Sequence, residues 1–164
     1  SSAVLLKNLF VELNNVVKDS GYELTMEATH HGPYVEKPAV FCEIGSTEEE
    51  WTDKHNGELM ANTIIQGLKN ENCSYKIAIG IGGPHYCSNF NKIILRSDTA
   101  ISHVCPKYLL EKLDEDLIKK SIEKRNANSA ARTRCSTYQY KNTALLARIC
   151  NPSRVVCRSP ERRS

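Results

Sequence analysis

Hydrophobic side chains near the start of the chain recur at intervals of three and four residues. They are Leu6, Leu9, Phe10, Leu13, Val16 and Val17. This spacing gathers them on one face of a helix, and Gly21 follows where such a helix would end. We therefore expect an amphipathic helix over residues 3–19.

Two segments with strand-like patterns follow. Apolar and polar residues alternate over residues 22–28 and stop at Thr29-His30-His31-Gly32-Pro33, which predicts a strand that runs into a histidine-bearing loop. Residues 39–44 are almost continuously apolar, as in a buried strand, and Glu43 lies inside this run. An acid in an apolar strand costs several kcal/mol by order of magnitude unless it meets a cation or donors, so Glu43 is a candidate site residue.

The middle of the chain predicts a helix followed by another strand and loop. Thr47 and Glu50 match the capping box that begins a helix, and we expect this helix over residues 48–69. Residues 75–81 are apolar and β-prone, and they lead into the turn-rich segment Gly82-Gly83-Pro84-His85-Tyr86-Cys87. A second histidine is thus expected at a strand end.

The next segments complete an α/β pattern. Ile93–Leu95 and Ala100–Val104 suggest two further strands, and the apolar residues between 109 and 122 support one or two helices. Strands alternating with helices predict a three-layer α/β/α sandwich with a mixed, mostly parallel sheet. Functional sites of such folds gather at the carboxyl ends of the strands, where the two histidine-bearing loops are expected.

The pattern fails after Asn128, and the charge changes with it. Residues 1–127 carry 14 Lys and Arg against 18 Asp and Glu, whereas residues 128–164 carry 8 against 1. We expect a domain over residues 1–127 and a basic, disordered tail over residues 128–164. Such a tail is more often simply solvated, although it can contact phosphates.

Composition narrows the class of protein. With 164 residues, 40% of them hydrophobic, the chain has room for one ordinary core. It has no apolar stretch of membrane-spanning length, and its first residues do not show a basic region followed by a small-residue cleavage site, so we expect a cytoplasmic protein without a membrane partner. Seven cysteines without a C-x-x-C pair fit a reducing compartment. Neither a dinucleotide fingerprint nor a P-loop is present.

Histidine offers the clearest chemistry, because imidazole is both a general base near neutral pH and a common metal ligand. His30, His31 and His85 are the main candidates, and His103 precedes Cys105-Pro106 at a further strand end. The amides of Gly82 and Gly83 are candidates for holding an oxyanion. The cysteines are interpreted as small apolar residues rather than nucleophiles.

Four blocks of the sequence resemble the archaeal and plant type of D-aminoacyl-tRNA deacylase, in the same order and at similar spacing. They are residues 27–33 (EATHHGP), 41–51 (FCEIGSTEEEW), 82–86 (GGPHY) and 103–108 (HVCPKY). The resemblance covers roughly residues 5–127. The family normally has an additional N-terminal βα portion and a different C-terminal part, so we expect a chain truncated at both ends.

The resemblance implies a zinc-containing hydrolase with a fold similar to that of peptidyl-tRNA hydrolases and nucleoside phosphorylases. Its substrate would be D-aminoacyl-tRNA, including aldehyde-modified forms, and its zinc would lower the pKa of a bound water. The expected zinc ligands are His30, His31, His85 and His103. The expected catalytic residues are Glu43, His31 and His85, and the expected substrate-binding residues are Gly82, Gly83, Tyr86 and Lys107.

Two other functions fit the same residues. One is a catalytically inactive fragment that still binds tRNA. The other is a metal-free esterase of the peptidyl-tRNA hydrolase type, which would use a histidine and an asparagine and would be insensitive to chelators.

Overall fold

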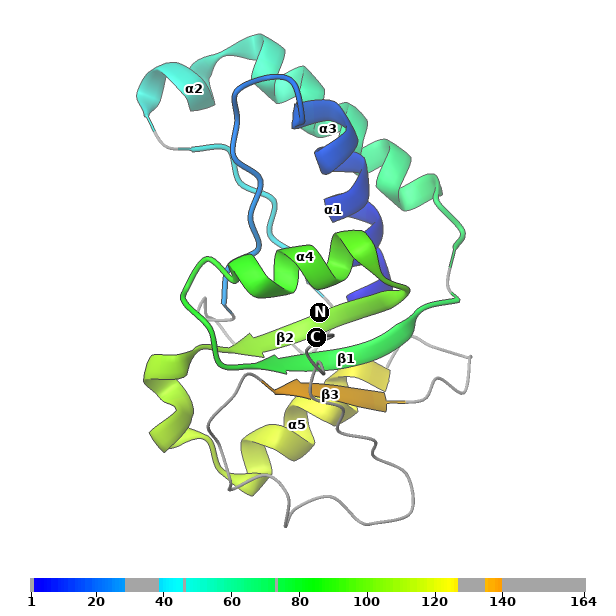
Figure 1. Cartoon of the computed structure of the whole chain (residues 1–164). Coiled ribbons are helices and arrows are strands. Elements are labelled where there is room, and N and C mark those ends of the chain that lie inside the picture. The colour runs from blue at the N-terminus through cyan, green and yellow to red at the C-terminus, as the bar shows by residue number, and fades with distance from the viewer. Residues whose placement is uncertain (1, 29–38, 46, 73, 127–134, 140–164) are drawn as a thin grey trace, which may run out of the picture.

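The chain was analysed as a computed structural model, which describes residues 2–28, 39–45, 47–72, 74–126 and 135–139 (Figure 1). The elements in chain order are α1 (Ala3–Val17), α2 (Glu48–Thr52), α3 (Lys54–Lys69), β1 (Lys76–Ile81), α4 (Ser88–Arg96), β2 (Thr99–Cys105), the 3₁₀ helix η1 (Lys107–Lys112), α5 (Glu115–Asn126) and β3 (Cys135–Gln139). None of the described helices has the length and apolar character needed to cross a membrane.

A parallel sheet with strand order β2-β1-β3 forms the centre of the fold. β1 pairs with β2 from Lys76↔Thr99 to Ile81↔Cys105, and with β3 from Ile77↔Cys135 to Ile81↔Gln139. The register between β1 and β2 shifts near Ile79, where β2 carries one extra residue. This is a β-bulge, a feature that re-aims side chains next to sites.

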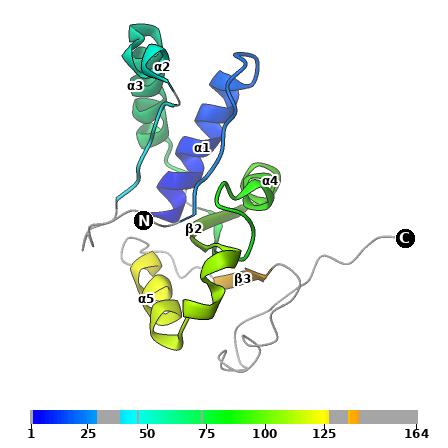
Figure 2. The ribbon, with the colours of Figure 1, turned by 90° about the vertical axis from the view of Figure 1, so that its left-hand side faces the viewer.

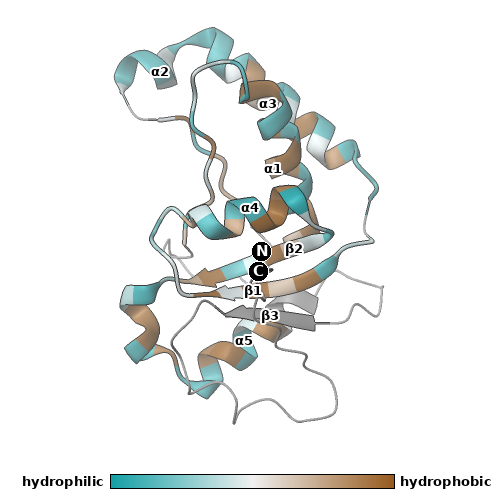
Figure 3. Ribbon diagram, in the orientation of Figure 1, coloured by the Kyte–Doolittle hydropathy of each residue, from teal (hydrophilic) through white to brown (hydrophobic). Residues whose placement is uncertain are grey.

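Helices cover both faces of the sheet, so the fold has three layers (Figures 1 and 2). On one face, Phe10 of α1 and Phe90 and Ile94 of α4 pack against strand residues such as Ala78. On the other face, Ile118 of α5 packs against Ile79 and Ile81 of β1, with further apolar residues from η1 and α5 around them. Figure 3 shows the hydrophobic positions on α1, α4 and α5 that supply these layers. The expected α/β fold with a parallel sheet is confirmed.

Two glycines allow close packing between the layers. A methyl group on Gly80 of β1 would lie 2.9 Å from Cζ of Phe90, so the absent side chain lets α4 lie directly on the sheet. Gly67 does the same for α3, where a Cβ would lie 2.6 Å from Cδ2 of Leu9. As a result α1 and α3 run side by side, which Figure 2 shows from a second direction.

The predicted helices and strands agree with the structure in part. The helices at residues 3–19, the strands at 75–81 and 100–104 and the C-terminal helical region are confirmed. The capping box of Thr47 and Glu50 is also confirmed, but the expected helix 48–69 divides at Asp53, whose carboxylate caps α3 by accepting from the His55 amide at 2.8 Å.

Three predicted strands are wrong. Residues 93–95 belong to α4, since Phe90 and Ile94 form the buried face of an amphipathic helix. Residues 22–28 and 39–44 are not in strands. In residues 22–28, the Ala28 amide donates to the carbonyl of His85 and the Met26 amide donates to the side chain of Asn91. These backbone amides are therefore bonded to a loop and to a helix side chain, and not to a neighbouring strand.

The expected disordered tail contains a strand. β3 lies between residues 128 and 164 and pairs in parallel with β1, so this part of the tail prediction is wrong. Sequence periodicity failed here because a five-residue strand is too short to show a pattern. The remainder of the tail lies outside the described residues, and the domain boundary at residue 127 stays a prediction.

Candidate functional site

The loop after β1 makes a sharp turn that presents His85. Gly82 and Gly83 have φ values of 96° and 82°, and Cys87 has 46°. Such positive values suit glycine, which has no Cβ to clash. Burial of Cys87 in the core fixes the end of the turn, where α4 begins.

Backbone hydrogen bonds join this loop to the one that follows β2. The Gly82 amide donates to the Cys105 carbonyl at 2.8 Å, and the Lys107 amide donates to the Gly83 carbonyl at 2.9 Å. The carboxyl ends of parallel strands lie at one edge of a sheet, so the two loops meet where sites of this fold class form. The Gly82 amide is therefore already engaged and does not serve an oxyanion, which leaves Gly83 as the candidate from this pair.

His85 lies between a tyrosine and a carboxylate. Its Nδ1 is 3.1 Å from Oη of Tyr108, at the start of η1, and its Nε2 is 3.9 Å from Oε2 of Glu27. The second distance is too long for a hydrogen bond but close enough for an ion pair when the imidazole is protonated. The side chains of His85 and Glu27 are 32% and 36% exposed, so solvent and a ligand reach both.

The segment that carries Glu27 is held against the His85 loop by Asn91 of α4. The Asn91 side chain accepts from the Met26 amide at 2.9 Å and donates to Oγ1 of Thr25 at 2.8 Å and to the Tyr86 carbonyl at 3.4 Å. The Thr25 hydroxyl also donates to the Tyr86 carbonyl. One asparagine thus fixes two loops relative to each other.

Raised pKa values are found for Cys87, Cys105 and Cys42. Burial, together with the negative charge of Glu27, raises the pKa of Cys87 to about 11. Burial also raises the pKa of Cys105 and of Cys42. Thiols with raised pKa values stay protonated near neutral pH, where the thiolate is the nucleophile. These values support the interpretation of the cysteines as apolar residues.

The other predicted site residues lie in different places. His30 and His31 fall outside the described residues. His103 is half-buried in β2, within the bulge. Glu43 is exposed in an irregular segment. The expectation that it lies in a buried strand, where its charge would need a partner, is therefore wrong. Tyr86 and Lys107, by contrast, are exposed in the two loops that meet at His85.

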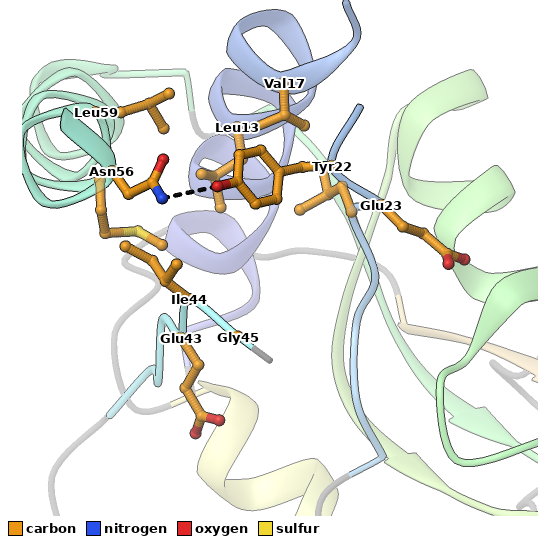
Figure 4. Close-up of a pocket in the computed structure, with 11 residues that line it drawn as sticks. Leu13, Val17, Tyr22, Glu23, Glu43, Ile44, Gly45, Asn56 and Leu59 are labelled. Carbon is orange, nitrogen blue, oxygen red and sulfur yellow. Dashed lines mark hydrogen bonds between the residues drawn. The ribbon is translucent and has the colours of Figure 1, made fainter. Parts of the chain in front are cut away.

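Glu43 borders a pocket between α1 and α3 (Figure 4). The pocket measures about 100 Å³, and its floor includes Tyr22, whose Oη accepts from Nδ2 of Asn56 at 2.7 Å. Figure 4 shows the Glu43 carboxylate directed away from this pair. Of the described residues that line the pocket, most are apolar and none is a histidine. We assign the chemistry to the His85 loop instead.

Sequence reasoning missed the partners of His85. Tyr108 lies shortly after the end of β2, and His85 lies shortly after the end of β1. Because the ends of neighbouring parallel strands meet, this shared position is the sequence feature that could have paired the two residues. Glu27 precedes the histidine pair by three residues in a segment with alternating polarity, where an acid is ordinarily solvated. Asn91 gave no signal, because a polar residue on a helix is ordinarily solvated.

Comparison with known proteins places this geometry in a family. The family model described as D-aminoacyl-tRNA deacylase matches residues 1–149. The chain belongs to the D-aminoacyl-tRNA deacylase family. The resemblance noted from the four sequence blocks is thereby confirmed.

Individual members of the D-aminoacyl-tRNA deacylase family match over most of the chain. The enzyme named D-aminoacyl-tRNA deacylase from Ignicoccus hospitalis is 41% identical over 110 residues, which are 67% of this chain and 44% of that protein. Those from Pyrococcus abyssi and Methanosarcina barkeri are 46% and 38% identical, over 67% and 79% of this chain and 41% and 42% of their own lengths. The chain therefore spans about two-fifths of the length of these deacylases.

A solved structure supports the fold. The crystal structure of a conserved protein of unknown function matches with a TM-score of 0.72 and 31% sequence identity. The match covers 82% of this chain and 46% of the other. The α/β architecture described above is thus the architecture of a longer protein of which this chain matches less than half.

The zinc implied by the family resemblance was tested against the described residues. They contain no group of three or more His, Cys, Asp or Glu side chains that could hold a metal ion. His85 and Glu27 supply two donor side chains, whereas zinc sites use at least three protein ligands. The described part of the site alone does not fit zinc.

Proposed function

We propose that this chain hydrolyses the ester bond between a D-amino acid and the 3′ end of tRNA, as the names of its relatives state for those proteins. The observation that carries this proposal is the position of His85, between Tyr108 and Glu27, where the loops after β1 and β2 meet in a chain of the deacylase family. A histidine with an oriented ring and a nearby carboxylate is suited to activating water for ester hydrolysis.

The proposed proton transfer starts from the hydrogen bond between His85 and Tyr108. With the proton on Nδ1 directed at Oη of Tyr108, Nε2 carries the lone pair and takes a proton from the attacking water. The imidazolium that results lies 3.9 Å from the Glu27 carboxylate, which stabilises it. The Gly83 amide is proposed to donate to the oxyanion, and the same imidazolium then protonates the departing ribose oxygen.

Zinc and the remaining histidines belong to this proposal as well. His30 and His31 precede Gly32-Pro33 and lie three and four residues after Glu27 in the sequence. We propose that His30 and His31 bind zinc, with His103 as a further candidate. His85 would join them as a ligand only in place of its role as the base, because its Nδ1 faces Tyr108 and its Nε2 is the proposed proton acceptor. Bound zinc would supply an activated water. Because the substrate is a charged tRNA, we place the activity in the cytoplasm and assign it to quality control in translation, including aldehyde-modified D-aminoacyl-tRNA.

The proposal is tested by comparing release of amino acid from D-aminoacyl-tRNA and from its L counterpart by the chain as it stands. We expect hydrolysis of the D form, and His85→Asn should lower its rate by about 10²- to 10⁴-fold, the usual contribution of a general base. Glu43→Gln is the comparison variant, since Glu43 is exposed on another segment. A larger loss in Glu43→Gln than in His85→Asn would contradict the assignment of the base.

Metal content distinguishes the alternatives. If zinc takes part, the purified chain contains about one zinc per molecule and a chelator abolishes hydrolysis. Hydrolysis that persists in chelator would instead support the metal-free esterase. Binding of tRNA without any hydrolysis would support the inactive fragment.

A further inference from the structure

Two tyrosine rings lie exposed on either side of His85. Tyr86 is 59% exposed and Tyr108 is 60% exposed, although tyrosine usually buries most of its ring. The ring of Tyr86 meets that of His85 edge to face, with centroids 5.1 Å apart and planes at 84°. Both aromatic surfaces therefore border the one histidine to which the chemistry is assigned.

The fold itself does not use the Tyr86 ring. Its backbone carbonyl receives the hydrogen bonds from Thr25 and Asn91, and a residue of any kind would provide that carbonyl. The next residue, Cys87, enters the core while Tyr86 stays outside it. Tyr108 differs, since its hydroxyl is committed to Nδ1 of His85. Tyr86 is thus the ring with a face left for a ligand.

Charge beside the rings favours a nucleotide over a purely apolar ligand. Lys107 is exposed, directly precedes Tyr108, and has its amide tied to Gly83 in the same pair of loops. A flat aromatic face next to a cation is the arrangement that binds single-stranded nucleic acid, where bases stack on aromatic rings and phosphates meet lysine. Glu27, which faces Nε2 of His85, would repel a phosphate at that position.

We propose that Tyr86 is the stacking platform for the terminal nucleobase of the tRNA 3′ end, with Lys107 paired to an adjacent phosphate. This inference rests on the proposed function, since it assigns a part of the same substrate. A base stacked on Tyr86 lies within one nucleotide of His85, so its ribose ester reaches the histidine while the base stays on the tyrosine. The platform thereby holds the substrate through a part that is common to all tRNAs, independent of the amino acid.

The test measures binding of adenosine monophosphate to the full chain by NMR titration, with ribose 5-phosphate as the probe that lacks a base. Tyr86→Phe keeps the ring and should bind adenosine monophosphate like the wild type. Tyr86→Ala should weaken that binding by about 5- to 150-fold, the range for loss of one base–aromatic stack, and leave ribose 5-phosphate unchanged. Trp51→Ala is the matched control, because Trp51 is 57% exposed on α2 and should not affect either probe.

Hydrolysis of D-aminoacyl-tRNA by the same variants separates this inference from the proposed function. Loss of adenosine monophosphate binding in Tyr86→Ala supports the platform, even in a chain that hydrolyses nothing, and in that case only the proposed function fails. Unchanged binding in Tyr86→Ala, or no binding of millimolar nucleotide by the wild type, overturns the platform, even where hydrolysis is observed.

Discussion

Asn91 offers the sharpest test of how the site is assembled. Its side chain accepts a hydrogen bond from the Met26 amide and donates to Thr25 and to the carbonyl of Tyr86. Replacing Asn91 with alanine removes all three bonds, while the side chain itself is only half-buried and fills little of the core. The segment that carries Glu27 would then lose its main attachment to α4.

The expected cost follows from these contacts. A typical hydrogen bond contributes about 0.5–1.5 kcal/mol net, and a buried donor left without a partner costs about 1–3 kcal/mol. Met26 is only 6% exposed, so water reaches its amide poorly, whereas Thr25 and Tyr86 are reached more easily. We therefore expect Asn91→Ala to lower the free energy of unfolding by about 1–3 kcal/mol.

Activity should fall as well, because Asn91 helps the bond from the Ala28 amide to the His85 carbonyl to hold Glu27 3.9 Å from His85. A misplacement of about 1 Å at a site can cost 10²-fold, so we expect the rate of D-aminoacyl-tRNA hydrolysis to fall by about 10- to 100-fold. Asn91→Asp keeps an acceptor for the Met26 amide and should recover most of the stability but not the bond to Tyr86. Asn89, two residues earlier on α4, makes none of these bonds and supplies the control Asn89→Ala.

The assays are urea unfolding, hydrogen exchange of the Met26 amide, and hydrolysis rate. Faster exchange at Met26 in Asn91→Ala, with exchange in β1 unchanged, would show that the attachment acts locally. If Asn91→Ala matched Asn89→Ala in unfolding free energy and in exchange at Met26, Asn91 would not hold the segment, and the reasoning would be wrong.

Three further outcomes are expected. Gly80→Ala should lower the free energy of unfolding by about 1–3 kcal/mol in thermal melts, since its methyl group would meet the Phe90 ring, and Phe90→Leu should reduce that penalty. Because the pKa of Cys87 is raised to about 11 in the folded chain, the protonated thiol stabilises the fold below pH 9, and this stability is lost as the pH rises through 11. In unfolding experiments over this pH interval, the free energy of unfolding of the wild type should fall by about 1–3 kcal/mol more than that of Cys87→Ala. Lys7→Met should lower the free energy of unfolding in urea by about 1–3 kcal/mol, because the buried ammonium donates to backbone carbonyls, including that of Thr99 at 3.1 Å. For each of the three variants, an unfolding midpoint equal to that of the wild type would contradict the contact concerned.

Elements that bury a periodic face were predictable from the sequence. The helix of residues 3–17 carries enough apolar positions to show its period, and the strand of residues 76–81 shows as a continuous apolar run that is buried on both faces. Residues 93–95 misled, because three consecutive apolar residues satisfy a strand and one helical turn equally. Residues 22–28 misled for another reason: their alternation is real, but their backbone partners come from a loop and a side chain, which no local pattern records.

The site was predictable only where chemistry and position coincide. His85 could be identified because it is a histidine at the end of a strand. Its two neighbours come from segments about 58 residues before and 23 residues after it, so their approach depends on the sheet and not on local sequence. Glu43 attracted attention as an acid among apolar residues, yet burial is a property of packing, and the segment that holds it lies at the surface.

The bulge in β2 adds one residue to the strand and shifts the pairing of the residues after it with β1 by one position. Ile101 pairs with Ala78 and Val104 with Gly80, so Ser102 and His103 together face Ile79. Both Ile101 and Val104 can therefore enter the same core, although residues three positions apart on a regular strand point to opposite faces. Without this accommodation every residue after His103 would be displaced by one position along β1, and Lys107 rather than Tyr108 would arrive beside His85. The bulge therefore sets which residue after β2 reaches His85, while the pairing of β1 with the first half of β2 stays regular.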